Sequence, residues 1–173
     1  FATQNPVEQE GTYPLPEAQL DRFLVKIQVG YPTVEEEDRI LAQASVGVGS
    51  VDVGQAGIAP VADRERLRRI RALARDVTVE DGVRRYILSL MRATRETPMI
   101  LLGAGPRAGV HLMVASRWFA ALDGRVFVTP DDVQRALHPV ICHRLVLAPE
   151  VELDGLGPEE VIDRVSTTVE VPR

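Results

Sequence analysis

The chain has 173 residues, of which 45% are hydrophobic, and its formal net charge is −5 at pH 7. This length allows one substantial core, or a core plus part of another, and the apolar fraction is typical of a soluble globular protein. The mild excess of acidic residues argues against a nucleic-acid partner held by bulk charge. No apolar run approaches the roughly 20 residues that a membrane-spanning helix needs.

Cys142 is the single cysteine, so an internal disulfide is excluded and a reducing, cytoplasmic environment is favoured. It lies in an apolar stretch, and we expect a buried, inert thiol rather than a catalytic one. The chain has no basic-then-apolar leader and does not begin with methionine. We therefore expect a fragment of a longer cytoplasmic protein.

The first predicted elements surround the polar cluster Thr3-Gln4-Asn5-Pro6. Asn5 is expected at a turn, at the end of a strand, because the residue before a proline is kept out of the helical region. Pro16 predicts the start of a short helix, since its missing N–H costs nothing there. Apolar and polar residues then alternate from Phe23 to Val29, which predicts a second strand.

The string ATQNP followed by EQEGTYPLPEAQLDRFL, within residues 2–24, resembles the MoxR family of AAA+ ATPases. The resemblance implies that Asn5 is sensor 1, which helps to place the water that attacks the γ-phosphate. It also implies that Arg22 is the arginine finger, which reaches the nucleotide of a neighbouring subunit. A carboxamide can donate and accept at once, and a guanidinium stabilises the spread charge of a phosphoryl transition state. The alternative is that Asn5 is a turn residue and Arg22 a surface charge.

An ATPase of this class needs a glycine-rich loop that ends in Gly-Lys-Ser/Thr and cradles the phosphates. Lys26 is the only lysine, it lies in the second predicted strand, and no such loop precedes it. The acidic Walker B pair that holds magnesium is absent as well. We therefore expect ATP and Mg²⁺ to be held by a missing N-terminal part, and we expect that the chain alone cannot hydrolyse ATP.

Gly30-Tyr31-Pro32 predicts a boundary, after which Thr33 and three acidic residues predict a helix that ends near Ser45. Residues 46–62 hold four glycines and predict a loop or linker.

Asp63 opens a second predicted helix over residues 63–77. Its inward stripe is expected to hold Leu67, Ile70, Ala74 and Val77. Six arginines fall mostly on the outer face, at positions 64, 66, 68, 69, 71 and 75. Acidic residues dilute their charge and no aromatic residue interleaves for stacking. A solvated or intersubunit face is therefore favoured, and a DNA-binding face stays as an alternative.

The third predicted helix runs from about Glu80 to Arg95. Its apolar residues repeat at i, i+3, i+4, i+7 and i+8, which is a strong amphipathic pattern: Val83, Tyr86, Ile87, Leu90 and Met91. Thr97-Pro98 ends this helix, and Met99 to Leu102 form a brief apolar link.

Residues 103–108 read GAGPRA, and Pro106 suits the first position of a helix. Arg107 then stands in the first turn, where the helix dipole disfavours a cation by roughly 0.3–1 kcal/mol. A cation is useful there if an anion joins it, because a helix start favours phosphate. The string resembles sensor 2 of the same ATPases, with Gly105 in place of the usual serine. The resemblance implies that Arg107 contacts the γ-phosphate of ATP, in cis or in trans; the alternative is a surface arginine.

The helix that begins at Pro106 is expected to bury one stripe and to end at Gly124. The stripe is formed by Ala108, Leu112, Ala115, Phe119 and Leu122. Thr129-Pro130-Asp131-Asp132 predicts the next helix start, with a threonine cap and an acid at the third position. A last helix is expected from Gly157-Pro158. His138, Cys142 and His143 match no zinc spacing, so no metal ligands are predicted.

The fold class that these patterns and the resemblance imply is mainly α. A helical AAA+ lid domain, residues 33–173, follows a strand-helix-strand remnant of an αβα ATPase core, residues 1–32. MoxR proteins are hexameric, chaperone-like ATPases, which implies ring subunits and client protein complexes as partners. The alternative is a non-enzymatic helical adaptor module. A Gly-x-x-x-x-Gly-Lys-Ser/Thr loop upstream of Phe1 would favour the ATPase.

Overall fold

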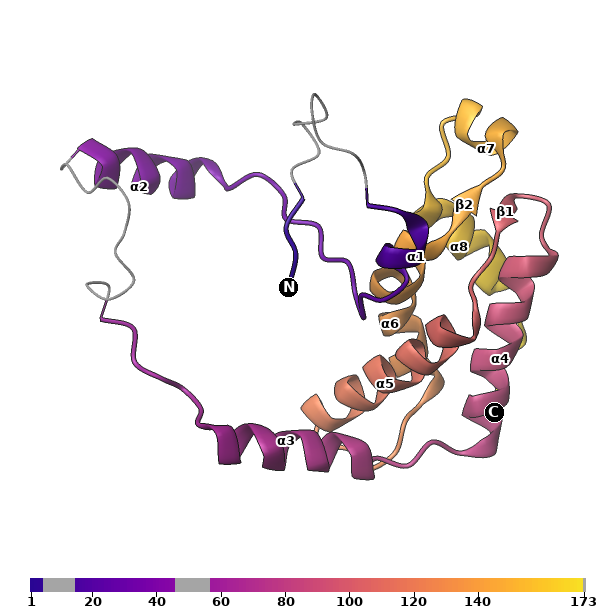
Figure 1. Cartoon of the computed structure of the whole chain (residues 1–173), viewed down its shortest axis with the longest axis horizontal. Coiled ribbons are helices and arrows are strands. Elements are labelled where there is room, and N and C mark those ends of the chain that lie inside the picture. Colours follow the sequence, from indigo (N-terminus) through magenta and orange to yellow (C-terminus); the bar gives the residue numbers. More distant parts are fainter. Residues whose placement is uncertain (5–14, 46–56, 173) are drawn as a thin grey trace. The chain divides into compact units, whose positions relative to one another are not determined.

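The computed structural model of the chain describes residues 1–4, 15–45 and 57–172 (Figure 1). The chain divides into two compact units. The first unit joins residues 1–26 to residues 73–173, and the second unit consists of residues 27–72. No described helix is both long enough and apolar enough to span a membrane.

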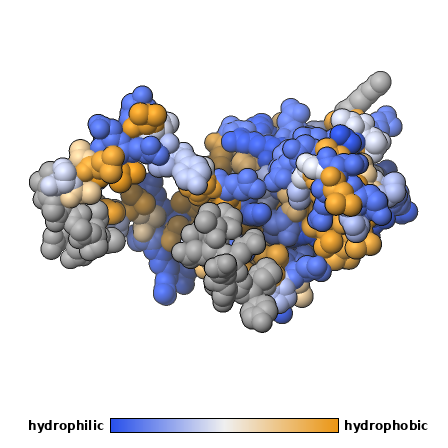
Figure 2. All heavy atoms as spheres, turned by 90° about the horizontal axis from the view of Figure 1, so that it is seen from above, coloured by the Kyte–Doolittle hydropathy of each residue, from blue (hydrophilic) through white to orange (hydrophobic). Residues whose placement is uncertain are grey.

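The second unit contains α2 (Val34–Ser45), which begins and ends as predicted. Thr33 caps it, because the Glu36 N–H donates to Thr33 Oγ1 at 3.3 Å and the Thr33 N–H donates to the Glu36 carboxylate at 2.9 Å. The apolar side chains of α2 are exposed, with Ile40 at 54% and Leu41 at 69%. Figure 2 shows apolar atoms among the hydrophilic ones on this helix.

The helix α3 (Arg64–Asp76) is confirmed, and Asp63 caps it by accepting the Arg66 N–H at 2.7 Å. The predicted inward stripe is only half right. Ala74 and Val77 are buried, whereas Leu67 and Ile70 are exposed. The reason is that the helix passes from one compact unit to the other at residue 73, so only its C-terminal end belongs to the main core.

In the first unit, α4 (Asp81–Glu96), α5 (Pro106–Leu122) and α6 (Pro130–Ile141) pack against one another (Figure 1). The periodicity predicted for the third helix is confirmed, because all five of its apolar positions are buried. Burying side chains of this size stabilises the fold by about 1.5–3 kcal/mol each. The least exposed of the large core side chains are Leu90, Leu112, Leu137, Ile141 and Ile162.

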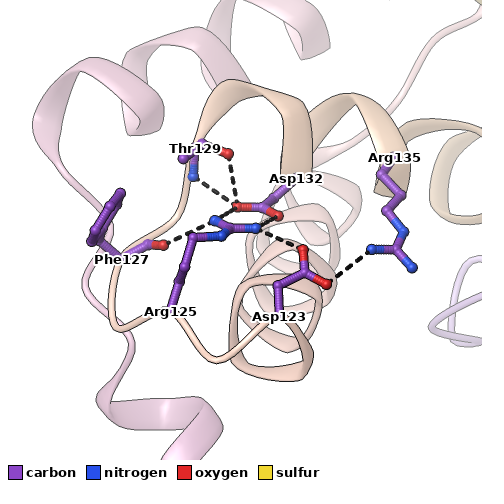
Figure 3. A network of polar contacts seen from close by, with 6 residues as sticks. All are labelled: Asp123, Arg125, Phe127, Thr129, Asp132 and Arg135. Atoms are coloured by element: carbon purple, nitrogen blue, oxygen red, sulfur yellow. Dashed lines mark hydrogen bonds and ion pairs between the residues drawn. The ribbon is translucent and has the colours of Figure 1, made fainter.

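A polar cluster fixes the corner between α5 and α6 (Figure 3). Arg125 donates to both carboxylate oxygens of Asp132, at 2.6 and 2.7 Å, and to Asp123 at 2.9 Å. Asp132 also accepts the N–H and the hydroxyl of Thr129, at 2.8 and 3.0 Å. The predicted capping pair at the start of α6 is thus confirmed, with a bidentate arginine added to it.

The C-terminal elements form a second, smaller core. β1 (Ile100–Leu102) pairs antiparallel with β2 (Val146–Leu147), which follows the short 3₁₀ helix η1 (Cys142–Arg144). Two further helices complete the unit, α7 (Pro149–Leu153) and α8 (Pro158–Thr167). The last predicted helix is confirmed by α8, which buries three apolar residues: Val161, Ile162 and Val165.

Two further expectations, for residues 23–29 and for Leu122, are wrong. Residues 23–29 do not form a strand, although α1 (Glu17–Leu20) follows Pro16 as predicted. Alternating apolar and polar residues indicate which side chains share a face, but a strand forms only when its backbone pairs with a neighbouring strand. In the described part of the chain the Lys26 N–H instead donates to the Pro139 carbonyl of α6, at 2.8 Å. Leu122 is not core but 73% exposed, because it is the last residue of α5.

Residues 1–4 also have no strand, and Asn5 lies outside the described residues. The mainly helical lid fold is therefore confirmed, while the flanking strands of the expected core remnant are not seen where the structure describes them. The division at residues 32 and 33 stays a prediction.

Candidate functional site

Arg107 lies in the first turn of α5, as its sequence context predicts. The loop before it passes tightly over the end of α4. The buried Thr94 hydroxyl accepts the Ala104 N–H at 3.0 Å, and a Cβ built on Gly103 would lie 2.6 Å from the Thr94 carbonyl oxygen. Only glycine fits this approach. The end of α4 therefore fixes the point at which α5 begins, and with it the position of Arg107.

The Arg107 guanidinium pairs with Asp21, the residue just before the predicted arginine finger. Its Nη1 donates to Asp21 Oδ2 at 3.0 Å, and the two side chains are 50% and 34% exposed. Arg107 is thus half open to solvent, with one anionic partner already beside it. The pair brings residues 86 positions apart in sequence into direct contact.

Arg22 lies in the turn that follows α1, and it is exposed. Its own N–H donates to the Gln19 carbonyl at 3.1 Å. Its guanidinium makes no hydrogen bond or ion pair with any residue that the structure describes. An arginine finger likewise needs an exposed guanidinium.

Arg144, in η1, is the buried centre of the site. Its side chain is only 1% exposed, and its Nε lies 3.4 Å from Asp21 Oδ1. Its Nη2 donates to the backbone carbonyls of Asp21, at 3.3 Å, and of Phe23, and its Nη1 donates to the Val140 carbonyl at 2.8 Å. Burial lowers the pKa of Arg144, and the Asp21 carboxylate opposes that effect.

Two histidines complete the surroundings of Arg144. His111 Nδ1 lies 2.5 Å from Arg144 Nη2. His143 Nε2 donates to the Phe23 carbonyl at 3.3 Å. Burial, and then the charge of Arg144, lower the pKa of both rings. Both rings therefore take up a proton less readily than a free histidine does.

The structure thus pairs Arg107 with Asp21, the residue next to Arg22 in the chain, while Asn5 falls outside the described residues. Sequence reasoning missed Asp21, Arg144 and His111 as members of the site. The sequence did contain an indication for two of them, Asp21 and Arg144. Asp21 immediately precedes Arg22, and Arg144 is a charge inside the otherwise apolar end of α6 and β2.

Cys142 and His138 belong to the packing rather than to the site. Cys142 is buried, as expected, and burial raises the pKa of its thiol to about 12. His138 Nε2 lies 2.7 Å from an Asp163 carboxylate oxygen on α8.

Comparisons with known proteins match the two parts of this site separately. A family profile described as an ATPase family associated with various cellular activities (AAA) matches residues 1–25, which include Asn5 and Arg22. A profile described as an AAA lid domain matches residues 92–165, which include Arg107 and Arg144.

Whole-chain relatives agree with these profiles. The chain is 40% identical to Chaperone MoxR1 of Mycobacterium tuberculosis, over 100% of this chain and 46% of that protein. It is 38% identical to the uncharacterized protein YeaC of Bacillus subtilis, over 99% of this chain and 52% of that protein. The chain belongs to the MoxR family of AAA+ ATPases.

A solved structure supports the fold of this MoxR-family chain. The crystal structure of a proposed ATPase from Cytophaga hutchinsonii has a TM-score of 0.85 and 31% identity, and the match covers 99% of this chain and 53% of that one. The chain spans about half the length of the curated relatives it matches.

Proposed function

We propose that this MoxR-family chain is the nucleotide-sensing and lid part of an ATPase that couples ATP binding and hydrolysis to chaperone-like remodelling or maturation of partner protein complexes. The name of MoxR1, a chaperone 40% identical to the chain, supports the chaperone-like part. The subunits of a ring and client complexes are its partners, and the cytoplasm is its compartment.

Three residues carry the chemistry in this proposal. Asn5 positions the attacking water, Arg22 completes the nucleotide site of a neighbouring subunit, and Arg107 contacts the γ-phosphate, in cis or in trans. The observation that supports these roles best is the pair between Asp21 and Arg107. It joins the turn that carries Arg22 to the helix start that carries Arg107, and both guanidinium groups remain accessible.

The residues of the chain fit part of an ATP site. Arg107 already binds one anion, the Asp21 carboxylate, and its half-exposed side chain leaves other N–H groups for a phosphate. The described residues contain no acidic or histidine cluster that could hold a metal ion. In this proposal ATP and Mg²⁺ are therefore bound mainly by Walker motifs that lie outside the sequence of this chain, in the core that residues 1–32 complete, and residues 33–173 act as the lid.

The function is tested by ATP turnover of the full-length protein with Arg107→Ala. A hydrogen bond to a charged group is worth about 1.5–3 kcal/mol, so kcat/KM for ATP should fall by about 10- to 100-fold. Arg84→Ala is the matched control, because Arg84 is an exposed arginine on α4 whose side chain pairs with Asp81, three residues away in the same helix. Equal turnover in the two variants would remove Arg107 from the proposed mechanism.

The 173-residue chain by itself should not hydrolyse ATP, since it has no Gly-Lys-Ser/Thr loop. Phosphate release from ATP is measured for the purified chain and for the full-length protein at equal concentration. Turnover by the isolated chain would contradict this part of the proposal.

A further inference from the structure

Arg144 contacts the backbone on both sides of Arg22. Its Nη2 donates to the carbonyl of Asp21, one residue before Arg22, and to the carbonyl of Phe23, one residue after it. His143, the neighbour of Arg144 in η1, adds a third contact, from Nε2 to the same Phe23 carbonyl at 3.3 Å. The backbone of Arg22 is therefore fixed at both ends while its side chain stays exposed.

Arg144 can act as an anchor because its own position is fixed from several directions. Its Nη1 donates to the Val140 carbonyl on α6 at 2.8 Å, and its Nη2 lies 2.5 Å from His111 Nδ1 on α5. Asp21 Oδ1 lies 3.4 Å from its Nε and supplies the opposite charge. Because a guanidinium presents five donors in a rigid fork, one side chain can hold two helices and a turn together.

The carbonyls of the turn that carries Arg22 depend on this anchor. The N–H groups of Asp21, Arg22 and Phe23 donate to backbone carbonyls at residues 17, 19 and 20. The carbonyls of Asp21 and Phe23, by contrast, accept from side chains of η1. Burying a guanidinium is costly, and an apolar side chain of similar volume often gives equal or better stability. An apolar side chain at residue 144 could stabilise the fold equally well, but it could not hold the backbone carbonyls of the turn. The buried guanidinium is therefore better explained by its orienting of the turn.

We propose that Arg144 is the positioning residue for Arg22: it holds the carbonyls of Asp21 and Phe23 so that the Arg22 guanidinium points away from the lid toward a second subunit. This inference rests on the proposed role of Arg22 as a finger. It adds that the lid itself, through η1, sets the direction in which the finger is presented.

The test uses the full-length protein with Arg144→Lys, which keeps the charge but has a single donor group and cannot hold both carbonyls. Misplacement of a reacting group by about 1 Å can cost about 10²-fold. We therefore expect kcat to fall by about 10- to 100-fold, with KM for ATP little changed. Arg84→Lys, on the exposed face of α4, is the matched control.

The decisive comparison repeats Arg144→Lys in an Arg22→Ala background. If Arg144 acts through Arg22, the second substitution lowers kcat no further, because two residues that act as a unit are not additive. If Arg144 has a purely structural role, Arg144→Lys should lower kcat by the same factor in both backgrounds. That result would overturn the inference. Unchanged kcat for Arg144→Lys alone would overturn it as well.

The outcome for Arg22→Ala separates the two proposals. Normal ATP turnover of the Arg22→Ala variant would refute the finger role. If Arg22→Ala is inactive but Arg144→Lys has normal turnover, only the anchor role of Arg144 is refuted.

If Arg144→Lys does not fold, judged by circular dichroism, His143→Phe takes its place. It removes one contact to the Phe23 carbonyl without touching a buried charge. A smaller loss of kcat that disappears in the Arg22→Ala background supports the anchor, and a loss that persists opposes it.

Discussion

Asp21 accepts a hydrogen bond from Arg107, with the two atoms Oδ2 and Nη1 3.0 Å apart. The other oxygen of the same carboxylate faces the buried Arg144 at 3.4 Å. One carboxylate therefore separates an exposed cation from a buried one. The two pairs differ in surroundings, so their contributions to stability should differ too.

The first prediction compares Asp21→Ala with Arg107→Ala by urea unfolding of the chain. Removing Arg107 breaks a half-exposed ion pair, which is worth about 0–1 kcal/mol. Removing Asp21 leaves the buried charge of Arg144 without its anion, and an unpaired buried charge costs more than a broken surface pair. Asp21→Ala should therefore lower the free energy of unfolding more. An equal or reversed order would show that Asp21 does not stabilise Arg144.

The second prediction concerns the two glycines that flank Ala104. Gly103→Ala places a Cβ 2.6 Å from the Thr94 carbonyl oxygen, and such overpacking costs about 1–3 kcal/mol. Gly105→Ser restores the usual family residue at a position where a Cβ meets nothing within 4 Å. The serine hydroxyl supplies the side-chain N-cap that Gly105 cannot give α5, which should stabilise the helix by a few tenths of a kcal/mol. Thermal unfolding of both variants should show opposite shifts in Tm; a Gly105→Ser protein as unstable as Gly103→Ala would contradict this geometry.

The third prediction is a loss of stability on mild acidification. The pKa values of His111 and His143 are lowered in the fold by burial and by Arg144, so the unfolded chain takes up protons first. The free energy of unfolding should therefore fall as the pH drops below the ordinary histidine value of 6.5. Urea unfolding at pH 8 and pH 5.5 measures it. The variant with His111→Gln and His143→Phe should show a weaker dependence between these pH values than the unmodified chain.

The fourth prediction concerns the corner drawn in Figure 3. Burial alone would raise the pKa of Asp132, but the hydrogen bonds from Arg125 and Thr129 outweigh it and hold this pKa below the ordinary value of 3.8. The stability that Asp132 contributes is complete above that value and is lost as the pH falls below it. Asp132→Asn should cost about 1–3 kcal/mol at pH 7, since it breaks a charged bidentate pair.

Asp123→Asn is the control for Asp132→Asn. Asp123 contacts the same Arg125 at 2.9 Å but is 45% exposed, whereas the Asp132 side chain is 3% exposed. Its substitution should change the free energy of unfolding by less than that of Asp132. Similar losses for both would mean that burial does not strengthen the pair.

Local patterns predicted the helices of the first unit well, because each pattern reported an interaction that is itself local. The repeat from Val83 to Met91 marks one buried face of α4, and Thr129 with Asp132 caps α6. The start of α5 at Pro106 followed from the fixed backbone of proline.

Long-range relationships were not predictable in the same way. The alternation from Phe23 to Val29 indicated a strand, yet the described chain pairs Lys26 with Pro139 on α6 instead. Arg144 was missed because the sequence does not show that a charge at residue 144 meets a turn at residues 21–23. Burial of such a charge depends on packing between segments more than a hundred residues apart.

The central claim, that Arg22 serves ATP hydrolysis, is tested most directly by the turnover of the full-length protein with Arg22→Ala beside Arg84→Ala. A finger supplied by a partner is worth about 10³–10⁵ in rate, so kcat should fall by at least about 10³-fold while Arg84→Ala stays at the unmodified rate. Both variants should remain folded, since the guanidinium groups of Arg22 and Arg84 are exposed. A folded Arg22→Ala protein with the unmodified kcat would contradict the account.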